Sequence, residues 1–218
     1  MIRTLAQMAD LFRAARRSGP PFLWVQTPDP LATIHRLEPL AKEGAEADPE
    51  HYAFDLARGL QPLNEAAQVA VKPRGMEGQN DIVRALDFFG AHAAPDAVLF
   101  IIGAHAAFLT DAGASRPIEV LSLWHLRDQL KQNFRMVVCL APTDRPPMEL
   151  ALDMTLISEP YPSAEELGEM VERLYAGAQL KKPSKDTVDR AVDALLGLAA
   201  FPAEQACAMS FRESTKGI

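Results

Sequence analysis

The chain has 218 residues, 48% of them hydrophobic and 23% charged, with a formal net charge of −7. These values suit a globular protein with one large domain, or one domain with a small appendage. The negative charge argues against a general nucleic-acid-binding protein. Residues 97–109 form the longest strongly apolar stretch, which is too short to cross a bilayer, and the N-terminus lacks a secretory apolar core. We therefore expect a cytoplasmic protein with no membrane partner.

The first part of the chain predicts a helix, a strand and a second helix. Apolar residues recur at helical spacing in residues 1–17, and Gly19-Pro20-Pro21 ends that pattern. Residues 22–27 form an apolar run that is typical of a buried strand. Pro30 suits the first turn of the next helix, because its missing N–H is not needed there.

The middle of the chain continues this alternation after one irregular segment. Residues 60–80 follow a second apolar run and contain Pro62, Pro73, Gly75 and Gly78, so we predict a mobile loop there. Asp81 can cap the helix that follows. The five predicted strands are residues 22–27, 51–56, 97–103, 136–142 and 154–158, and the helices of the middle part are residues 81–91, 118–133 and 148–152.

Strands that alternate with helices predict an α/β fold, with a three-layer, parallel, five-stranded sheet. Beyond the last strand every segment is helical, over residues 163–178, 185–196 and 202–212. Ser163 and Glu166 have the spacing of a capping box, and Gly197 can end a helix. We expect a sheet domain in residues 1–158 and a small helical lid with the start of a linker in residues 159–218.

The cysteines indicate structural thiols rather than a redox or metal site. Cys139 lies in a predicted strand and Cys207 in a predicted late helix. We expect both to be reduced. No cysteine and histidine stand at metal-ligand spacing, so the sequence predicts no metal site.

The turn after the first strand lacks the groups that bind phosphate. Ligands of parallel sheets usually lie at the carboxyl ends of the strands, where a phosphate loop would have the pattern G-x-x-x-x-G-K-[ST]. Here the strand runs into Thr27-Pro28-Asp29-Pro30. The two prolines have no N–H to donate, and the Asp29 carboxylate would repel a phosphate.

Five residues at these strand ends are candidates for contact with a ligand in the crevice: Thr27, Asp29, His105, Thr143 and Asp144. His105 could be a base or a structural, hydrogen-bonded histidine, and Asp144 could instead cap a turn. No nucleophile, base and orienting group stand together, so we predict no catalytic residue.

The order of elements resembles an AAA+ ATPase module of the P-loop type, a sheet followed by a helical lid. Thr143-Asp144-Arg145-Pro146 is similar to the end of the AAA+ fourth strand, where a polar residue senses the γ-phosphate. The resemblance allows Arg145 to act on the nucleotide of a neighbouring subunit, as AAA+ arginines do, but a plain surface arginine is the favoured interpretation. Arg127 with Asp128 forms either an ion network on a helix or a subunit contact.

A closer resemblance is to the N-terminal, degenerate AAA-like domain of the Ycf-type ATPases, which are named after an uncharacterised chloroplast reading frame. Short motifs carry it in the same order along nearly the whole chain: Thr27-Pro28-Asp29, Arg58-Gly59-Leu60, Gly103-Ala104-His105, Leu126-Arg127-Asp128, Pro142 to Leu150 and Leu195 to Ala206. In that family a complete ATPase domain follows. The chain ends at Ile218, about where the linker to that domain would begin.

The resemblance implies ATP and Mg²⁺ only in the following domain, and no cofactor for this chain. AAA+ enzymes end their third strand with an acidic pair, whereas this strand ends in Ile102-Gly103-Ala104-His105. We therefore do not expect ATP hydrolysis by this chain alone. The implied partners are its own C-terminal ATPase domain, further copies in a ring and an unidentified protein client.

Three functions remain at this stage. The first is a non-catalytic AAA-like domain that serves assembly or regulation of an AAA+ ATPase. The second is a stand-alone protein-interaction adaptor with an AAA-like fold. The third is an enzyme that uses the crevice near Thr27, His105 and Thr143 for another small ligand.

Overall fold

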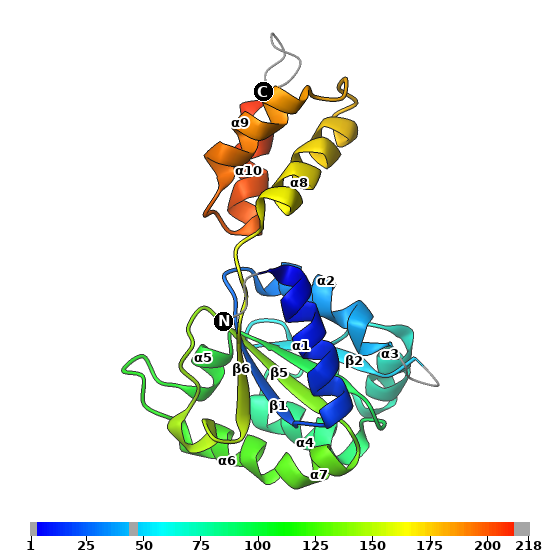
Figure 1. Ribbon diagram of the computed structural model, residues 1–218. Coiled ribbons are helices and arrows are strands. Elements are labelled where there is room, and N and C mark those ends of the chain that lie inside the picture. The colour runs from blue at the N-terminus through cyan, green and yellow to red at the C-terminus, as the bar shows by residue number, and fades with distance from the viewer. Residues whose placement is uncertain (1–3, 44–47, 212–218) are drawn as a thin grey trace. The chain divides into compact units, whose positions relative to one another are not determined.

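The computed structural model describes residues 4–43 and 48–211. Its main feature is a six-stranded sheet in the order β3-β2-β4-β5-β1-β6 (Figure 1). The β2–β3 pair is antiparallel, and all the other neighbouring pairs are parallel. The strands are β1 (Phe22–Gln26), β2 (His51–Asp55), β3 (Gly59–Pro62), β4 (Val98–Ile102), β5 (Met136–Ala141) and β6 (Met154–Ser158).

Two parts of the sequence prediction are wrong in the region after β2. The sheet has six strands rather than five, and residues 60–80 are not an irregular loop but contain β3, α3 (Glu65–Val71) and the short 3₁₀ helix Lys72–Arg74. Gly59 begins β3 with a φ of +73°, and a Cβ there would lie 2.4 Å from the carbonyl oxygen of Gly78. Only glycine combines this backbone conformation with so close a neighbour, so the β2–β3 hairpin depends on it.

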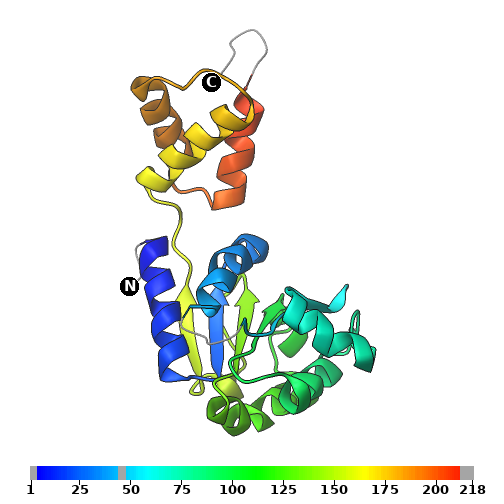
Figure 2. The same cartoon turned by 90° about the vertical axis from the view of Figure 1, so that its right-hand side faces the viewer.

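Helices cover both faces of the sheet (Figures 1 and 2). One face is covered by α1 (Leu5–Ser18) and α2 (Pro30–Ala41), and the other by α4 (Ile82–His92), α5 (Ala104–Phe108), α6 (Pro117–His125) and α7 (Arg127–Gln132). Phe22 and Trp24 of β1 belong to one fully buried cluster with Leu86 of α4 and Leu123 of α6. Successive side chains of a strand point to opposite faces, so each strand contributes to both layers of the core.

Local sequence signals for the helix ends are largely confirmed. The Asp81 side chain accepts hydrogen bonds from the first backbone N–H groups of α4, and Pro30 occupies the first turn of α2. In place of the predicted helix 118–133 the structure has two helices, α6 and α7. Leu126 separates them, and its N–H donates to the carbonyl of Leu123 at 3.1 Å.

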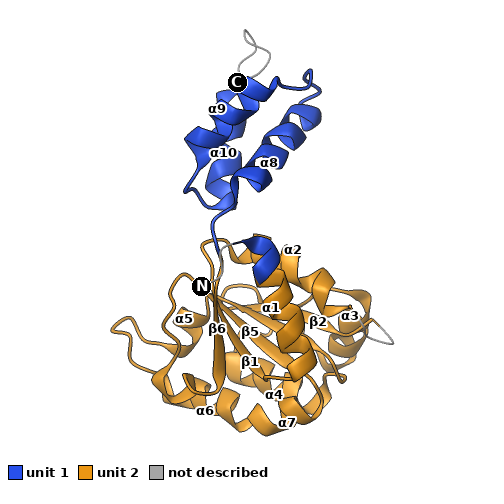
Figure 3. Ribbon diagram, in the orientation of Figure 1, with its two compact units in different colours: residues 1–7, 160–218 blue, residues 8–159 orange. Residues whose placement is uncertain are grey.

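The chain divides into two compact units between Glu159 and Pro160 (Figure 3). The sheet unit comprises residues 8–159. The helical unit comprises residues 160–218, together with residues 1–7. The helical unit contains α8 (Ala164–Gly177), α9 (Lys185–Leu195) and α10 (Ala200–Ser210), whose shared core includes Leu167, Val171, Tyr175, Val192, Leu195, Ala203 and Cys207.

The signals predicted for the helical unit are present. Ser163 and Glu166 form the reciprocal capping box at the start of α8. Gly197 follows α9 with a φ of +86°, the left-handed conformation that ends many helices. Cys139 and Cys207 are both free and buried. Among the described residues, no helix is long and apolar enough to cross a membrane.

Candidate functional site

The carboxyl edge of the sheet is closed by hydrogen bonds between the ends of three adjacent strands. The backbone N–H of Thr27, after β1, donates to the carbonyl of Ala141 in β5 at 2.8 Å. The N–H of Glu159, after β6, donates to the carbonyl of Gln26 at 2.9 Å. The turn from β1 into α2 therefore lies directly beside the end of β6.

A chain of hydrogen bonds runs through this turn and ends on a carboxylate. The N–H of Asp29 donates to Thr27 Oγ1 at 3.0 Å, Thr27 Oγ1 lies 2.8 Å from Thr33 Oγ1, and Thr33 Oγ1 lies 2.6 Å from Glu159 Oε2. An ionised carboxylate and a carbonyl only accept hydrogen bonds, so the Thr33 hydroxyl shares its hydrogen between Glu159 and the carbonyl of Asp29, 2.9 Å away, and the Thr27 hydroxyl donates to Thr33. Both hydroxyls are buried, and each has a partner for its hydrogen and for its oxygen.

Glu159 is a nearly buried charge that the first two turns of α2 hold in place. Its side chain is 8% exposed and forms an ion pair with Arg36, whose side chain is 25% exposed. A carboxylate in such surroundings needs an opposite charge and hydrogen bonds, and Arg36 and Thr33 supply both. The anion at the start of α2 is thus part of the protein itself.

Two further backbone donors of the turn have partners within it. Asp29 is the N-cap of α2 and accepts a hydrogen bond from the N–H of Ala32, while the N–H of Thr33 donates to the carbonyl of Asp29. Pro28 and Pro30 have no N–H. These residues do not fit a nucleoside triphosphate, because the N–H groups of Asp29, Ala32 and Thr33 are engaged and the carboxylates of Asp29 and Glu159 would repel the phosphates.

The end of β4 does not fit a nucleotide-bound magnesium ion. Gly103, with a φ of +70°, begins the short helix α5, which carries His105. No carboxylate, the ligand type that Mg²⁺ prefers, is present in Ile102-Gly103-Ala104-His105. His105 Nδ1 is buried and has no hydrogen-bond partner among the described atoms, so the hydrogen-bonded role considered for it is not seen at that atom.

The crevice candidates do not form one group. Thr27 and Asp29 belong to the same hydrogen-bond chain, whereas Thr143 is exposed and contributes only its carbonyl, which accepts a hydrogen bond from Trp24 Nε1 at 2.8 Å. Asp144 is also exposed and makes no turn-capping hydrogen bond within the part of the chain that the structure describes. A role for any of them in binding a ligand stays a prediction.

The two interface candidates lie in different regions. Arg127 pairs with Asp128 at 3.0 Å and Asp153 at 3.3 Å, which is the ion network that the sequence suggested. It lines a cavity of about 610 Å³ together with Pro21 and Met154, at the amino edge of the sheet. Arg145 is exposed in the loop after β5 and has no ion pair within residues 4–43 and 48–211. Whether either arginine contacts another subunit stays a prediction.

Sequence reasoning missed Thr33, Arg36 and Glu159. Thr33 and Arg36 are three residues apart on a predicted helix, so their shared face could have been noticed. Glu159 is 126 residues from Thr33 and 123 from Arg36, and only a composition change marked its position. The sequence contains no local signal for a contact over that separation.

Comparison with known proteins identifies the type of domain. The family model of the SpoVK-like AAA ATPase N-terminal domain matches residues 6–158. The chain belongs to this family. The match confirms the AAA+ relationship, and the six-stranded, mostly parallel sheet is of the AAA+ type. A search of the curated proteins found no match to the SpoVK-like chain.

Solved structures share this fold at low sequence identity. A DNA replication initiation factor matches 94% of the SpoVK-like chain and 60% of its own, with a TM-score of 0.60 and 9% identity. A structure on katanin self-assembly matches 94% and 67%, with a TM-score of 0.58 and 10% identity. The FIGL-1 AAA domain in complex with ADP matches 91% and 62%, with a TM-score of 0.53 and 14% identity. The chain therefore spans about 60% of the length of the first of these, and such identities show the fold alone.

Proposed function

We propose that this chain is a non-catalytic AAA-like domain that serves assembly or regulation of an AAA+ ATPase. The observation that carries the proposal is Glu159, whose carboxylate lies beside the first two turns of α2, where it accepts a hydrogen bond from the Thr33 hydroxyl and pairs with the Arg36 guanidinium. Those groups are donors that a phosphate at this position could otherwise use. The domain thus keeps the scaffold of a nucleotide-binding fold while its own side chain fills the anion position.

The energetics favour the internal carboxylate over a nucleotide. A fully buried charge pair that loses one partner typically costs about 3–5 kcal/mol, and the Glu159–Arg36 pair is only partly exposed. A triphosphate would have to displace Glu159 and approach Asp29 against like charge. It would gain no backbone donors from Pro28 and Pro30 in return.

The partners follow from the family description as an N-terminal domain. We infer that ATP and Mg²⁺ act in a separate ATPase domain of the parent protein, of the Ycf-type family, and that this chain contacts that domain or further copies in a ring. The protein client is not identified. We infer a cytoplasmic location.

Calorimetry with Mg-ATP tests the proposal directly. We expect no binding heat and no ATP turnover with the chain of residues 1–218, and the same result for Glu159→Gln because the prolines and Asp29 remain. A cooperative unfolding transition recorded on the same samples shows that the protein is folded. Micromolar affinity for Mg-ATP in the wild type would contradict the proposal.

The gene beyond codon 218 separates the proposal from its alternative, a stand-alone adaptor. A reading frame that continues into G-x-x-x-x-G-K-[ST] supports the ATPase assignment, and a stop codon supports the adaptor. With such a longer protein in hand, the ATPase rate and the assembly state are compared with and without residues 1–218. We expect deletion to change at least one of them.

A further inference from the structure

The two edges of the sheet differ in how their outer backbone groups are satisfied. At the β3 edge, the N–H of Leu60 donates to the carbonyl of Gln79 at 2.9 Å, and the Leu60 carbonyl accepts from the N–H of Gly78 at 2.8 Å. Pro62, at the end of β3, has no N–H. The chain therefore covers this edge itself, as proteins usually do with the exposed edges of their sheets.

The β6 edge has no such cover within residues 4–43 and 48–211. β6 is the last strand of the sheet and pairs only with β1 (Figure 1). The N–H of Glu159 donates to the carbonyl of Gln26 in β1. Backbone groups of successive residues point to alternate sides of a strand, so those of Met154, Leu156 and Ser158 point to the open side. No hydrogen bond joins these open groups to another described segment.

β6 also lacks the features that protect an exposed edge strand. Its sequence, Met-Thr-Leu-Ile-Ser, contains no charged residue and no proline, and it pairs with β1 in unbroken register, without a bulge. Leu156 is 49% exposed, and Thr155 and Ser158 are exposed as well. An edge strand of this kind is open to pairing with a further strand.

Exposed apolar side chains lie next to this edge. Leu156 stands beside Trp24 of β1 in the register of the sheet, on the face that α6 covers. On α6, Trp124 is 42% exposed, and its Nε1 donates to Asp153 Oδ2 at 3.2 Å, which places Trp124 beside the start of β6. Leu152, two residues before β6, is 100% exposed. Open backbone groups and uncovered apolar surface therefore occur together, as they do where chains associate.

The open edge is complementary to itself. Its three outward-facing residues are spaced evenly about Leu156. When β6 pairs antiparallel with β6 of a second copy, about a two-fold axis at Leu156, this residue lies opposite its own copy and Met154 lies opposite Ser158. Each opposed pair exchanges two hydrogen bonds, so every outward N–H and C=O obtains a partner. A two-fold contact needs this kind of self-complementary surface.

The charges at the two ends of β6 are compatible with this pairing. The same register sets Asp153 of one copy opposite Glu159 of the other. Asp153 already pairs with Arg127 at 3.3 Å, and Glu159 pairs with Arg36. Each carboxylate thus has its own counter-charge, which reduces the repulsion between the copies.

We propose that β6 pairs antiparallel with β6 of a second copy of this chain, so that two sheets join into one continuous sheet across a two-fold axis at Leu156. Backbone hydrogen bonds fix the register, and the exposed side chains of Leu156, Trp124 and Leu152 supply apolar surface to be covered. This contact closes a dimer, in contrast to the head-to-tail contacts of a ring. The proposal does not depend on whether the sheet unit binds nucleotide.

Sedimentation equilibrium over a concentration series tests the proposal on the chain of residues 1–218. We expect a reversible dimer. Leu156→Pro removes an outward-facing N–H and leaves the hydrogen bonds to β1 in place, and Leu156→Lys sets two like charges opposite each other at the axis. Each should raise the dimer dissociation constant at least about tenfold. The control Leu156→Val keeps the N–H and an apolar side chain and should dimerise like the wild type. Cooperative unfolding of each variant shows that it is folded.

Cross-linking through an introduced cysteine locates the contact. Cys139 and Cys207 are both buried, so the introduced thiol is the exposed one. We expect a short bismaleimide to link Leu156→Cys into a covalent dimer, because position 156 faces its own copy across the axis. The control is Val69→Cys, at a position of α3 that is exposed but distant from β6 in the order of the sheet. It should stay largely unlinked.

Four results would overturn the proposal. A wild-type chain that stays monomeric throughout the series would mean that a second copy does not cover β6 and that a strand of another protein is needed. A dimer that both Leu156→Pro and Leu156→Lys leave intact would place the contact elsewhere. Equal cross-linking of Leu156→Cys and Val69→Cys would indicate chance collisions. Dimerisation seen only after removal of residues 212–218 would identify that segment as the occupant of the edge.

Discussion

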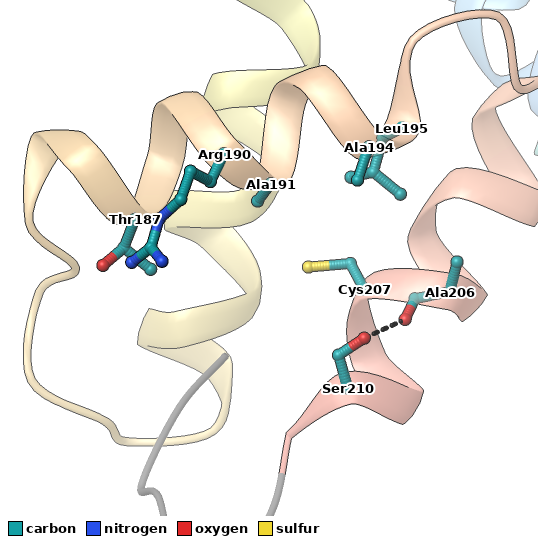
Figure 4. Close-up of a pocket in the computed structure, with 8 residues that line it drawn as sticks. All are labelled: Thr187, Arg190, Ala191, Ala194, Leu195, Ala206, Cys207 and Ser210. Carbon is teal, nitrogen blue, oxygen red and sulfur yellow. Dashed lines mark hydrogen bonds between the residues drawn. The ribbon is translucent and has the colours of Figure 1, made fainter.

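The β1–α2 turn and the α9–α10 groove differ in how their side chains are satisfied. The polar groups of the turn bond to one another, whereas apolar side chains of the groove are left uncovered. In the turn, Thr27, Thr33, Arg36 and Glu159 satisfy one another, so little capacity is left for an external ligand. The groove between α9 and α10, with a volume of about 330 Å³, is lined by small side chains such as Ala191, Ala194, Ala206 and Cys207 together with the polar Thr187, Arg190 and Ser210 (Figure 4). Polar groups can be paired inside one domain by a single well-placed side chain. Apolar surface is removed from water only when other surface packs against it.

Among the substitutions that test this comparison, Glu159→Ala is expected to have the largest effect on stability. The substitution leaves Arg36 without its carboxylate and leaves the Thr33 hydroxyl with the Asp29 carbonyl as its remaining acceptor, so we expect a loss of about 2–4 kcal/mol in the free energy of unfolding. Urea unfolding followed by circular dichroism measures the change. Ser158→Ala, which removes an exposed hydroxyl bonded to Gln26, is the control and should cost less than about 0.5 kcal/mol. Equal stability of the two variants would show that the Glu159 pair contributes nothing.

Thr33→Val is expected to have the next largest effect. Valine has nearly the same shape as threonine but lacks the hydroxyl, so Glu159 loses a donor and Thr27 loses its acceptor. We expect destabilisation of about 1–2 kcal/mol, measured by the same unfolding experiment. Thr155→Val removes a hydroxyl from an exposed position of β6 and serves as the control. A loss for Thr33→Val no larger than for Thr155→Val would contradict the directed hydrogen-bond chain.

A buried histidine in the sheet unit sharpens the comparison, because its polar groups are only half satisfied. His51 is fully buried at the start of β2; its Nδ1 lies 2.8 Å from Glu38 Oε1, and its Nε2 has no partner among the described atoms. Burial lowers the pKa of His51 from its ordinary value of 6.5, an effect that Glu38 opposes. The unfolded chain then binds more protons at this residue, so the stability is complete above pH 6.5 and falls as the pH drops below it.

Replacement of His51 should remove this pH dependence. We expect the unfolding free energy of the wild type to fall more steeply below pH 6.5 than that of His51→Gln. Thermal or urea unfolding over a pH series gives both slopes. His35→Gln, at an exposed position of α2, is the control and should retain the wild-type slope. Parallel slopes for the wild type and His51→Gln would assign the acid sensitivity to groups other than His51.

The smallest effect on stability is expected from Ala194→Leu, which tests whether the groove is open. Leucine is a good helix former at an exposed position, so the unfolding free energy should change by less than about 0.5 kcal/mol. The added side chain should slow the reaction of Cys207 with a thiol reagent, while Cys139 stays unreactive within β5. An unchanged Cys207 rate, with Ala208→Leu as the control, would mean that the reagent reaches the thiol by another path.

Much of the fold could be predicted because its signals are local. Apolar runs located β1, β2, β4, β5 and β6, and Asp81, Ser163 and Gly197 marked helix ends that the structure contains. The hairpin after β2 was missed because β3 has only four residues and ends in Pro62, which weakens a strand pattern. Helix α5 was missed for a similar reason, since five residues are too few to establish a period.

The sequence by itself determined that the phosphate loop and the acidic pair are missing, because those are statements about residue types at fixed spacing. Only the tertiary structure decided what takes their place. Glu159 reaches Thr33 and Arg36 because β6 lies beside β1, and strand order is set by long-range packing rather than by neighbouring residues. The openness of the α9–α10 groove likewise depends on how two helices pack, which the small residues of each helix do not reveal alone.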